Sequence, residues 1–137
     1  MKGSAPTASS LLAALNRHRE KPAPLSAFKV VVDRFLDDGE FVHLALEGNG
    51  WTWVDPLMLV TDRRVLLLRS GVLGFWRKRG EVAARDVSGA TLKGAMFSGR
   101  IIVSSHRGTF LRMMYNWEIN AREFVDSLNQ MISGGHR

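Results

Sequence analysis

The sequence of 137 residues contains no cysteine, and no uncharged apolar run approaches the roughly 20 residues that a membrane-spanning helix needs. The absence of cysteine excludes disulfides, thiolate metal sites and a cysteine nucleophile, and it agrees with a reducing compartment. Met1 and Lys2 are followed by small and polar residues rather than by the apolar core of a secretory signal. We therefore expect a cytoplasmic protein, with peripheral contact to a membrane as an alternative.

The common sequence motifs of enzymes are also missing. The four histidines are scattered and show neither of the helical spacings that bind zinc. The sequence has no phosphate-binding loop of the type G-x-x-x-x-G-K-[ST] and no G-x-S-x-G nucleophile elbow. We therefore expect a protein that is not an enzyme, with no catalytic residue, cofactor, metal or small-molecule substrate.

Positive charge is abundant and concentrated. The chain has a net charge of +6, and residues 63–85 hold seven basic residues against the single acid Glu81. The candidate anion-binding residues are Arg69, Arg77, Lys78 and Arg79. Such a group suits an anionic membrane surface or, as a weaker alternative, nucleic acid. The other interpretation is that these cations are solvated and discourage pairing at a sheet edge.

The first 24 residues predict a flexible N-terminal segment. Residues 3–10 are small and polar, a short helix starts after Ser9 or Ser10 and runs to about Arg19, and a linker with two prolines follows at 20–24. The main domain is then 25–137. It opens with a second predicted helix, over 26–37.

After Gly39 the pattern changes to short strands. Strand-like runs with turn signals between them occupy 41–47, 56–60, 65–68, 75–82, 87–92, 100–104 and 109–114. A capping-box pattern, Asn120 with Glu123, predicts the start of a final amphipathic helix that runs to about 133. The order indicates a mainly β protein with α, built as a sandwich or a partly open barrel.

The segment 56–68 is decisive for this interpretation. It is either one apolar helix or two strands joined at 61–64, and its strand-length runs rich in valine and leucine favour the hairpin. Neither run alternates with polar residues, so both faces of the hairpin should be covered. The sandwich itself covers one face of the hairpin. The other face is covered by the N-terminal helices, by another copy of the chain or by a foreign partner. The candidate interface residues are Trp51, Trp53, Leu66, Leu68 and Trp76.

Three short motifs resemble the bacterial pleckstrin-homology-like (PH-like) domains, over about residues 35–133. That family shows an L-x-x-G-E opening, a T-D-x-R turn and a closing helix with an A-x-x-F-V pattern. These motifs match Leu36 to Glu40, Thr61 to Arg64, and Ala121 to Val125. The resemblance implies a seven-stranded β-sandwich or partly open barrel capped by a C-terminal helix, here with an N-terminal helical extension.

The resemblance also implies a binding module without an active site. Lipid-binding members carry basic residues in and beside the first hairpin loop, but residues 48–55 contain none. Bacterial relatives are more often linked to protein contacts and ring-like self-assembly. We therefore expect a scaffolding module that binds a protein or its own copies. The alternative is a basic adaptor that binds anionic lipid or nucleic acid through the 69–79 region.

Overall fold

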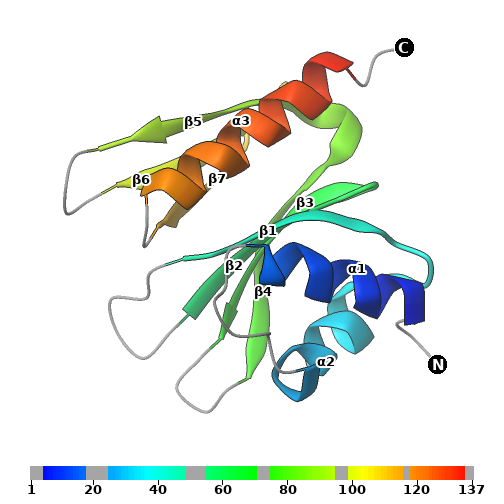
Figure 1. Cartoon of the computed structure of the whole chain (residues 1–137). Helices are drawn as coiled ribbons and strands as arrows, with labels where there is room; N and C mark the ends of the chain where they lie inside the picture. The colour runs from blue at the N-terminus through cyan, green and yellow to red at the C-terminus, as the bar shows by residue number, and fades with distance from the viewer. Residues whose placement is uncertain are drawn as a thin grey trace.

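The computed structural model describes residues 5–17, 25–48, 55–70, 75–94, 99–115 and 118–134. Seven strands in this part of the chain form two antiparallel sheets (Figure 1). The first has the order β1-β2-β3-β4, with bounds Val42–Glu47, Asp55–Thr61, Arg64–Ser70 and Trp76–Ala83. The second has the order β5-β6-β7, with bounds Val87–Lys93, Arg100–Ser105 and Phe110–Met114. A short 3₁₀ turn, Ala84–Asp86, connects them.

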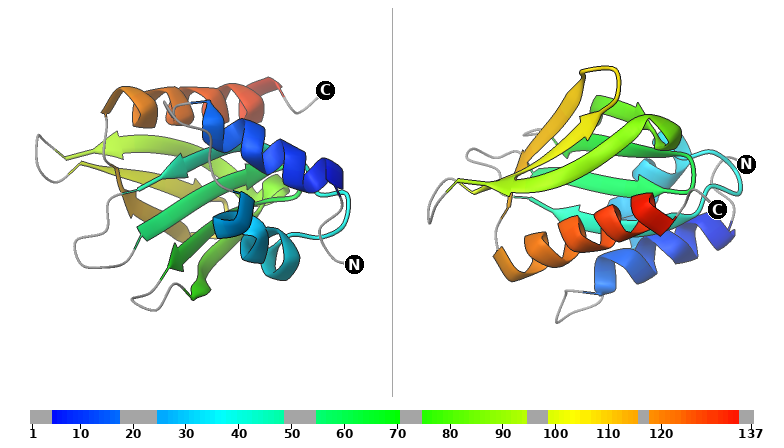
Figure 2. Two further views of the ribbon diagram at one scale, coloured as in Figure 1. Left: turned by 60° about the horizontal axis from the view of Figure 1, so that its bottom comes forward. Right: turned by 90° about the horizontal axis from the view of Figure 1, so that it is seen from above.

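Three helices in the described residues complete the fold: α1 (Ala5–Asn16), α2 (Leu25–Phe35) and α3 (Glu118–Gly134). Figures 1 and 2 show α3 beside the three-stranded sheet, while α1 and α2 cover the four-stranded sheet. The expected mainly β architecture with seven strands, a C-terminal helix and an N-terminal helical extension is thus confirmed for the described residues. The sheets form an open arrangement and not a closed barrel.

The main core lies between the two sheets and α3. The helix presents four buried side chains at helical spacing: Ala121, Phe124, Val125 and Leu128. They pack with alternate residues of the strands, among them Met58, Val60, Val65, Ile101 and Val103. The period of the helix and the period of the strands therefore place their apolar side chains in the same space.

A second core covers the outer face of the four-stranded sheet. The β2–β3 hairpin sends its other set of side chains into this core, namely Leu57, Leu59, Leu66 and Leu68. Helices α1 and α2 cover them with Leu11, Leu15, Phe28, Val31 and Val32. Both faces of the hairpin are buried, as its sequence predicted. Of the three covers considered, the structure shows the helices of the same chain.

The N-terminus differs from the expected mobile segment. Helix α1 begins at Ala5, and Thr7 and Ser10 within it are buried. The backbone N–H of Val42 donates to Ser10 Oγ at 2.9 Å, and this hydroxyl donates to the Thr7 carbonyl at 2.8 Å. A small polar residue therefore connects α1 to β1 through a buried hydrogen bond. The expected proline linker lies outside the described residues.

The ends of the other two helices also differ from the expected ones. Helix α2 spans 25–35 rather than 26–37, which is within the usual uncertainty of helix ends. Helix α3 begins at Glu118, so Asn120 lies inside the helix and does not cap it. An acidic residue in the first turn suits the helix dipole and supports the earlier start.

Helix α3 also covers the free edge of β5. The Ala90 N–H donates to Asn129 Oδ1 at 2.9 Å, and Asn129 Nδ2 donates to the Ala90 carbonyl at 2.9 Å. The amide side chain thereby makes the pair of hydrogen bonds that a neighbouring strand would make. This arrangement occupies the middle of the β5 edge.

The second core predicts a large loss of stability when Leu66 is shortened. Leu66→Ala removes a side chain with no exposed surface, and we expect the free energy of unfolding to fall by about 2–5 kcal/mol. Urea denaturation measures this change. The control Ile119→Ala, at a side chain that is 78% exposed, should stay within about 0.5 kcal/mol of the parent. Equal effects would contradict the buried position of Leu66.

Candidate functional site

A buried polar cluster connects two of the sequence motifs, L-x-x-G-E at Leu36 to Glu40 and T-D-x-R at Thr61 to Arg64. The Glu40 carboxylate has no exposed surface. Arg64 Nε donates to Glu40 Oε2 at 3.0 Å, and Arg64 Nη2 donates to Glu40 Oε1 at 2.9 Å. Thr61 Oγ1 donates to Glu40 Oε2 at 2.6 Å, and the Asp37 N–H donates to Glu40 Oε1 at 2.9 Å. Four donors therefore satisfy the buried carboxylate.

Local backbone structure brings these groups together. Gly39 has a φ of +77°, a conformation that glycine adopts without strain. On the other side, the Thr61 hydroxyl accepts from the N–H groups of Arg63 and Arg64, both at 3.1 Å, and so closes the β2–β3 turn. The Asp62 carboxylate accepts from the Phe41 N–H at 3.0 Å and holds this turn against the start of β1.

The cluster shifts the pKa values of both its charged partners. Burial by itself would raise the pKa of Glu40, but the hydrogen bonds from Arg64, Thr61 and Asp37 outweigh it, and the pKa is lowered. The hydrogen bonds to Glu40 raise the pKa of Arg64 further above its ordinary value. Arg64 also donates to the Phe35 carbonyl at 2.6 Å and to Glu81 at 3.1 Å. With its ions paired and its carboxylate inaccessible, the cluster is a structural element.

This cluster predicts an acid-sensitive component of stability. Because folding lowers the pKa of Glu40 below 4.5, the unfolded chain binds more protons near that pH. The stabilisation is complete above about pH 5 and falls as the pH drops through the folded pKa. Glu40→Gln should lower the free energy of unfolding at pH 7 by about 3–5 kcal/mol and remove this part of the acid dependence.

Urea denaturation of both proteins between pH 3 and pH 7 gives the comparison. The control is Glu118→Gln, since the Glu118 side chain is 67% exposed and lies 3.9 Å from Arg122. It should change the stability by less than about 1 kcal/mol at all pH values. An acid dependence unchanged by Glu40→Gln would contradict the role given to Glu40.

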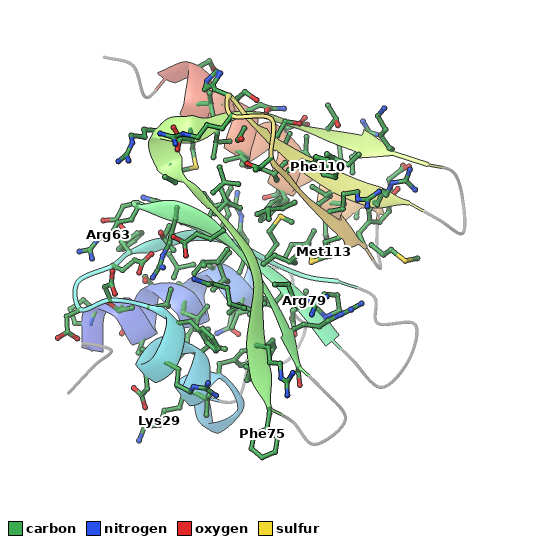
Figure 3. The ribbon with its side chains drawn as sticks, turned by 180° about the vertical axis from the view of Figure 1, so that it is seen from behind. Lys29, Arg63, Phe75, Arg79, Phe110 and Met113 are labelled. Atoms are coloured by element: carbon green, nitrogen blue, oxygen red, sulfur yellow. The ribbon has the colours of Figure 1, made fainter. Side chains whose placement is uncertain are left out.

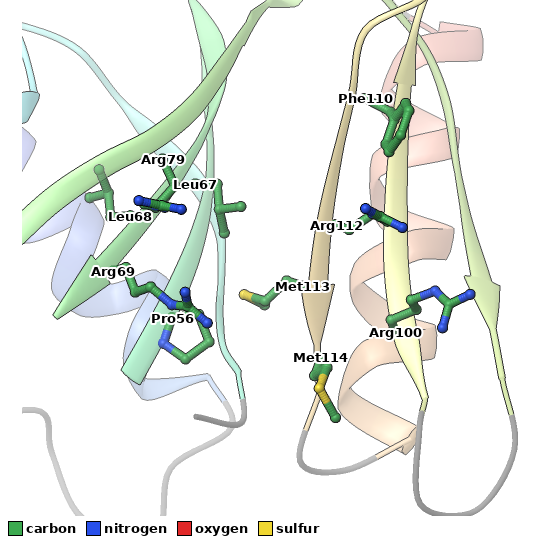
Figure 4. Close-up of a pocket in the computed structure, with 10 residues that line it drawn as sticks. All are labelled: Pro56, Leu67, Leu68, Arg69, Arg79, Arg100, Phe110, Arg112, Met113 and Met114. Atoms are coloured by element: carbon green, nitrogen blue, oxygen red, sulfur yellow. The ribbon is translucent and has the colours of Figure 1, made fainter. Parts of the chain in front are cut away.

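A second feature, an arginine-lined cleft, lies at the opposite end of the β2–β3 hairpin. Its volume is about 510 Å³, and Figure 4 shows its walls, with β2–β4 on one side and β6–β7 on the other. Four arginines line this cleft: Arg69, Arg79, Arg100 and Arg112. The remaining lining residues are Pro56, Leu67, Leu68, Phe110, Met113 and Met114. No carboxylate is among these lining residues.

The strand pattern explains how two of the arginines reach the cleft. Arg69 has the same parity on β3 as Val65 and Leu67, so it points toward the space between the sheets at the open end. The pairing of β3 with β4 shifts between Leu67 and Leu68, which leaves Arg79 as the extra residue of a bulge. Figure 3 shows Arg79 and Met113 on the side where the two sheets face each other.

A glycine contact joins the two walls above the cleft. An added Cβ on Gly80 of β4 would lie 2.4 Å from Leu111 Cδ2 of β7. Only glycine allows the two strands to approach this closely without displacing Leu111. The next residues on the two strands, Arg79 and Arg112, line the cleft.

The arginines of the cleft make no ion pair with an acid among the described residues. Arg112 lies over the Phe110 ring, 5.2 Å from its centroid, which is cation–π geometry. Arg100 Nε is buried and has no hydrogen-bond partner in this part of the chain. Four like charges at one cleft therefore favour an anion that is not part of the described structure.

The predicted basic residues separate into two groups. Arg69 and Arg79 line the cleft, and Arg77 lies opposite Arg69 in the β3–β4 register. Lys78 points to the other face and pairs with Glu81 at 3.1 Å. Sequence reasoning missed Arg100 and Arg112, because they come from β6 and β7 and no local pattern connects those strands to residues 69–79.

Three of the five predicted interface residues are buried. Leu66 and Leu68 have no exposed surface, and Trp76 is 9% exposed with its ring centroid 6.1 Å from that of Phe28. These three side chains belong to the core under α1 and α2, so in this structure they offer almost no exposed surface to a partner. The exposed aromatic residue at this point is Phe75, at 63%. Trp51 and Trp53 lie outside the described residues.

Another cavity, of about 570 Å³, lies below the C-terminal half of α3. Its lining is mainly apolar, including Val60, Val65, Leu128 and Ile132. The charged residues around it carry both signs, Asp62 beside Arg64 and Arg85. It therefore lacks the uniform charge of the arginine cleft.

Other searches of the described residues gave no further candidate. No group of three or more histidine, aspartate or glutamate side chains there is arranged to hold a metal ion. None of the helices in the same residues has the length and apolar character to cross a bilayer. Comparison of the sequence with models of protein families and with curated proteins finds no match.

Proposed function

We propose that the chain is a PH-like, non-enzymatic binding module that holds an anionic partner in its arginine cleft. The carrying observation is the convergence of Arg69, Arg79, Arg100 and Arg112 from four strands on one cleft without a lining carboxylate. Charge-assisted hydrogen bonds from guanidinium groups are among the stronger contacts available to carboxylates and phosphates.

The PH-like part of this proposal has two supports. The described strands form sheets of four and three, followed by α3, in the order that the resemblance implies. In addition, the residues of the L-x-x-G-E and T-D-x-R motifs, Glu40, Thr61 and Arg64, meet in a single hydrogen-bonded cluster. The two motifs therefore share one structural role, and this supports interpreting their joint occurrence as a family feature.

Self-assembly has less support than it had from the sequence. The argument for it was an apolar hairpin face that needed a cover, and α1 and α2 of the same chain supply that cover. The open arginine cleft has no such internal partner among the described residues. Electrostatic attraction at this cleft is therefore the better-supported basis for binding.

The test measures binding of three anionic probes: phosphatidylserine-containing vesicles, oligothymidylate and polyglutamate. We expect the parent protein to bind at least one of them, with affinity that falls as salt is added. Arg79→Gln with Arg112→Gln should weaken this binding at least about tenfold, because each lost contact to a charged group is worth more than 1 kcal/mol.

The matched control is Lys29→Gln with Arg34→Gln, which removes the same charge from α2. Both residues are exposed, and Figure 3 shows Lys29 on the helical side, away from the cleft. This control should bind within about twofold of the parent, since long-range charge effects are screened. Equal losses in the two double variants, or no binding of any probe, would disprove the proposed function.

A further inference from the structure

The three-stranded sheet has one face that no described helix or strand covers. Its other face packs against α3 and the four-stranded sheet through buried side chains such as Val103 and Leu111. Successive side chains of a strand point to opposite faces, so the neighbours of these residues, such as Ile102 and Arg112, lie on the uncovered face. Figure 3 looks onto this face, with Phe110 labelled and α3 behind the sheet. We call it the open face.

One row of the open face combines an aromatic ring with small neighbours. Phe110 on β7 is 53% exposed. Its cross-strand partner is Ser104 on β6, which pairs in turn with Gly89 on β5. A hydroxymethyl group and a hydrogen atom are too small to cover the ring from the side. A flat group therefore has room to stack on Phe110 above these two strands.

The next two rows supply positive charge and no acid. Arg112 lies opposite Ile102 in one row, and Arg100 lies opposite Lys93 in the other. None of these three cations makes an ion pair with a described residue. The guanidinium group of Arg112 lies over the Phe110 ring, 5.2 Å from its centroid. The aromatic ring and the cations therefore form one continuous surface.

We propose that the open face binds single-stranded nucleic acid, with a base stacked on Phe110 and phosphates held by Arg112, Arg100 and Lys93. This inference rests on the proposed function and names its ligand, because Arg100, Phe110 and Arg112 also line the arginine cleft. Proteins that bind single strands without sequence preference combine a basic surface with aromatic side chains on which bases stack. A guanidinium group stacks on flat rings as well, so Arg112 enlarges the stacking surface.

The composition of the open face favours a single strand over other anionic partners. Insertion into a membrane buries apolar side chains below the headgroups, but Ile102 and Met114 on this face are already partly buried. An acidic protein segment would pair with the cations and leave the exposed ring without a flat partner. The bases of a duplex are stacked on one another and are not available to Phe110. An unpaired base uses both the ring and the space above Ser104.

The experiment measures binding of a labelled oligothymidylate of about 12 nucleotides, a length within the range of sites for single strands. Phe110→Leu keeps an apolar side chain but removes the ring, and it should weaken binding at least about fivefold through the lost stacking contact. The matched control is Phe75→Leu, at a ring that is 63% exposed and lies far from Phe110 in Figure 3. This control should bind as the parent does.

A second comparison changes the ligand and keeps the parent protein. An abasic strand of the same length retains the phosphates and lacks the bases. It should bind at least about tenfold more weakly than oligothymidylate, because stacking is lost at every position. This comparison remains decisive if a variant of the protein does not fold.

Lys93 distinguishes the open face from the cleft, because it lies on β5 and does not line the cleft. Lys93→Gln should reduce the slope of log affinity against log salt by about 0.7, the value for one phosphate contact on a single strand. Lys29→Gln removes the same charge from α2, on the helical side of the molecule in Figure 3. It should leave the slope unchanged.

The outcomes separate this inference from the function on which it rests. Failure of oligothymidylate to bind, equal binding of the abasic strand, equal effects of Phe110→Leu and Phe75→Leu, or an unchanged slope for Lys93→Gln would each overturn the inference. The proposed function would remain intact if vesicles, polyglutamate or the abasic strand still bind in a manner that depends on Arg79 and Arg112. If no anionic probe binds, both fail.

Discussion

The β2–β3 hairpin has apolar side chains on both faces, and each face needs a cover. One face packs on the second sheet and α3, and the other packs under α1 and α2. Burial of a full leucine contributes roughly 1.5–3 kcal/mol, so neither face is stable in contact with water. The hairpin therefore makes the N-terminal helices part of the folded domain. Because these helices cover the outer face, the apolar side chains of the hairpin are buried on both faces of the four-stranded sheet.

The Glu40 cluster fixes the positions of α2, β1 and the β2–β3 turn relative to one another. Its groups come from the end of α2, the start of β1 and the β2–β3 turn, and Arg64 extends it to Glu81 on β4. A fully hydrogen-bonded buried network specifies one arrangement of the elements around it, because any other arrangement would leave buried charges unsatisfied. The apolar cores supply most of the stability, and the polar cluster determines how the turn and α2 meet.

The sequence allowed the strands, the hairpin and the need for two covers to be predicted, since these depend on periodicity over short stretches. The sequence did not reveal the residues whose role depends on contacts with distant parts of the chain. Ser10 looks like part of a mobile segment, yet its hydroxyl accepts from Val42, 32 residues away. Asn120 looks like a helix cap, but the helix starts at Glu118. Half of the arginine cleft, Arg100 and Arg112, required knowledge of how the second sheet lies against the first.

The amide of Asn129 has a consequence for how far strand pairing can proceed. The three-stranded sheet has two borders, β5 and β7, and the Asn129 side chain already occupies the N–H and C=O of Ala90 on β5. Endless growth of a sheet needs both borders free, one to receive a strand and one to offer the next. Because the Asn129 side chain terminates one border, this sheet cannot be extended at both borders, which disfavours fibre formation through repeated edge-to-edge stacking.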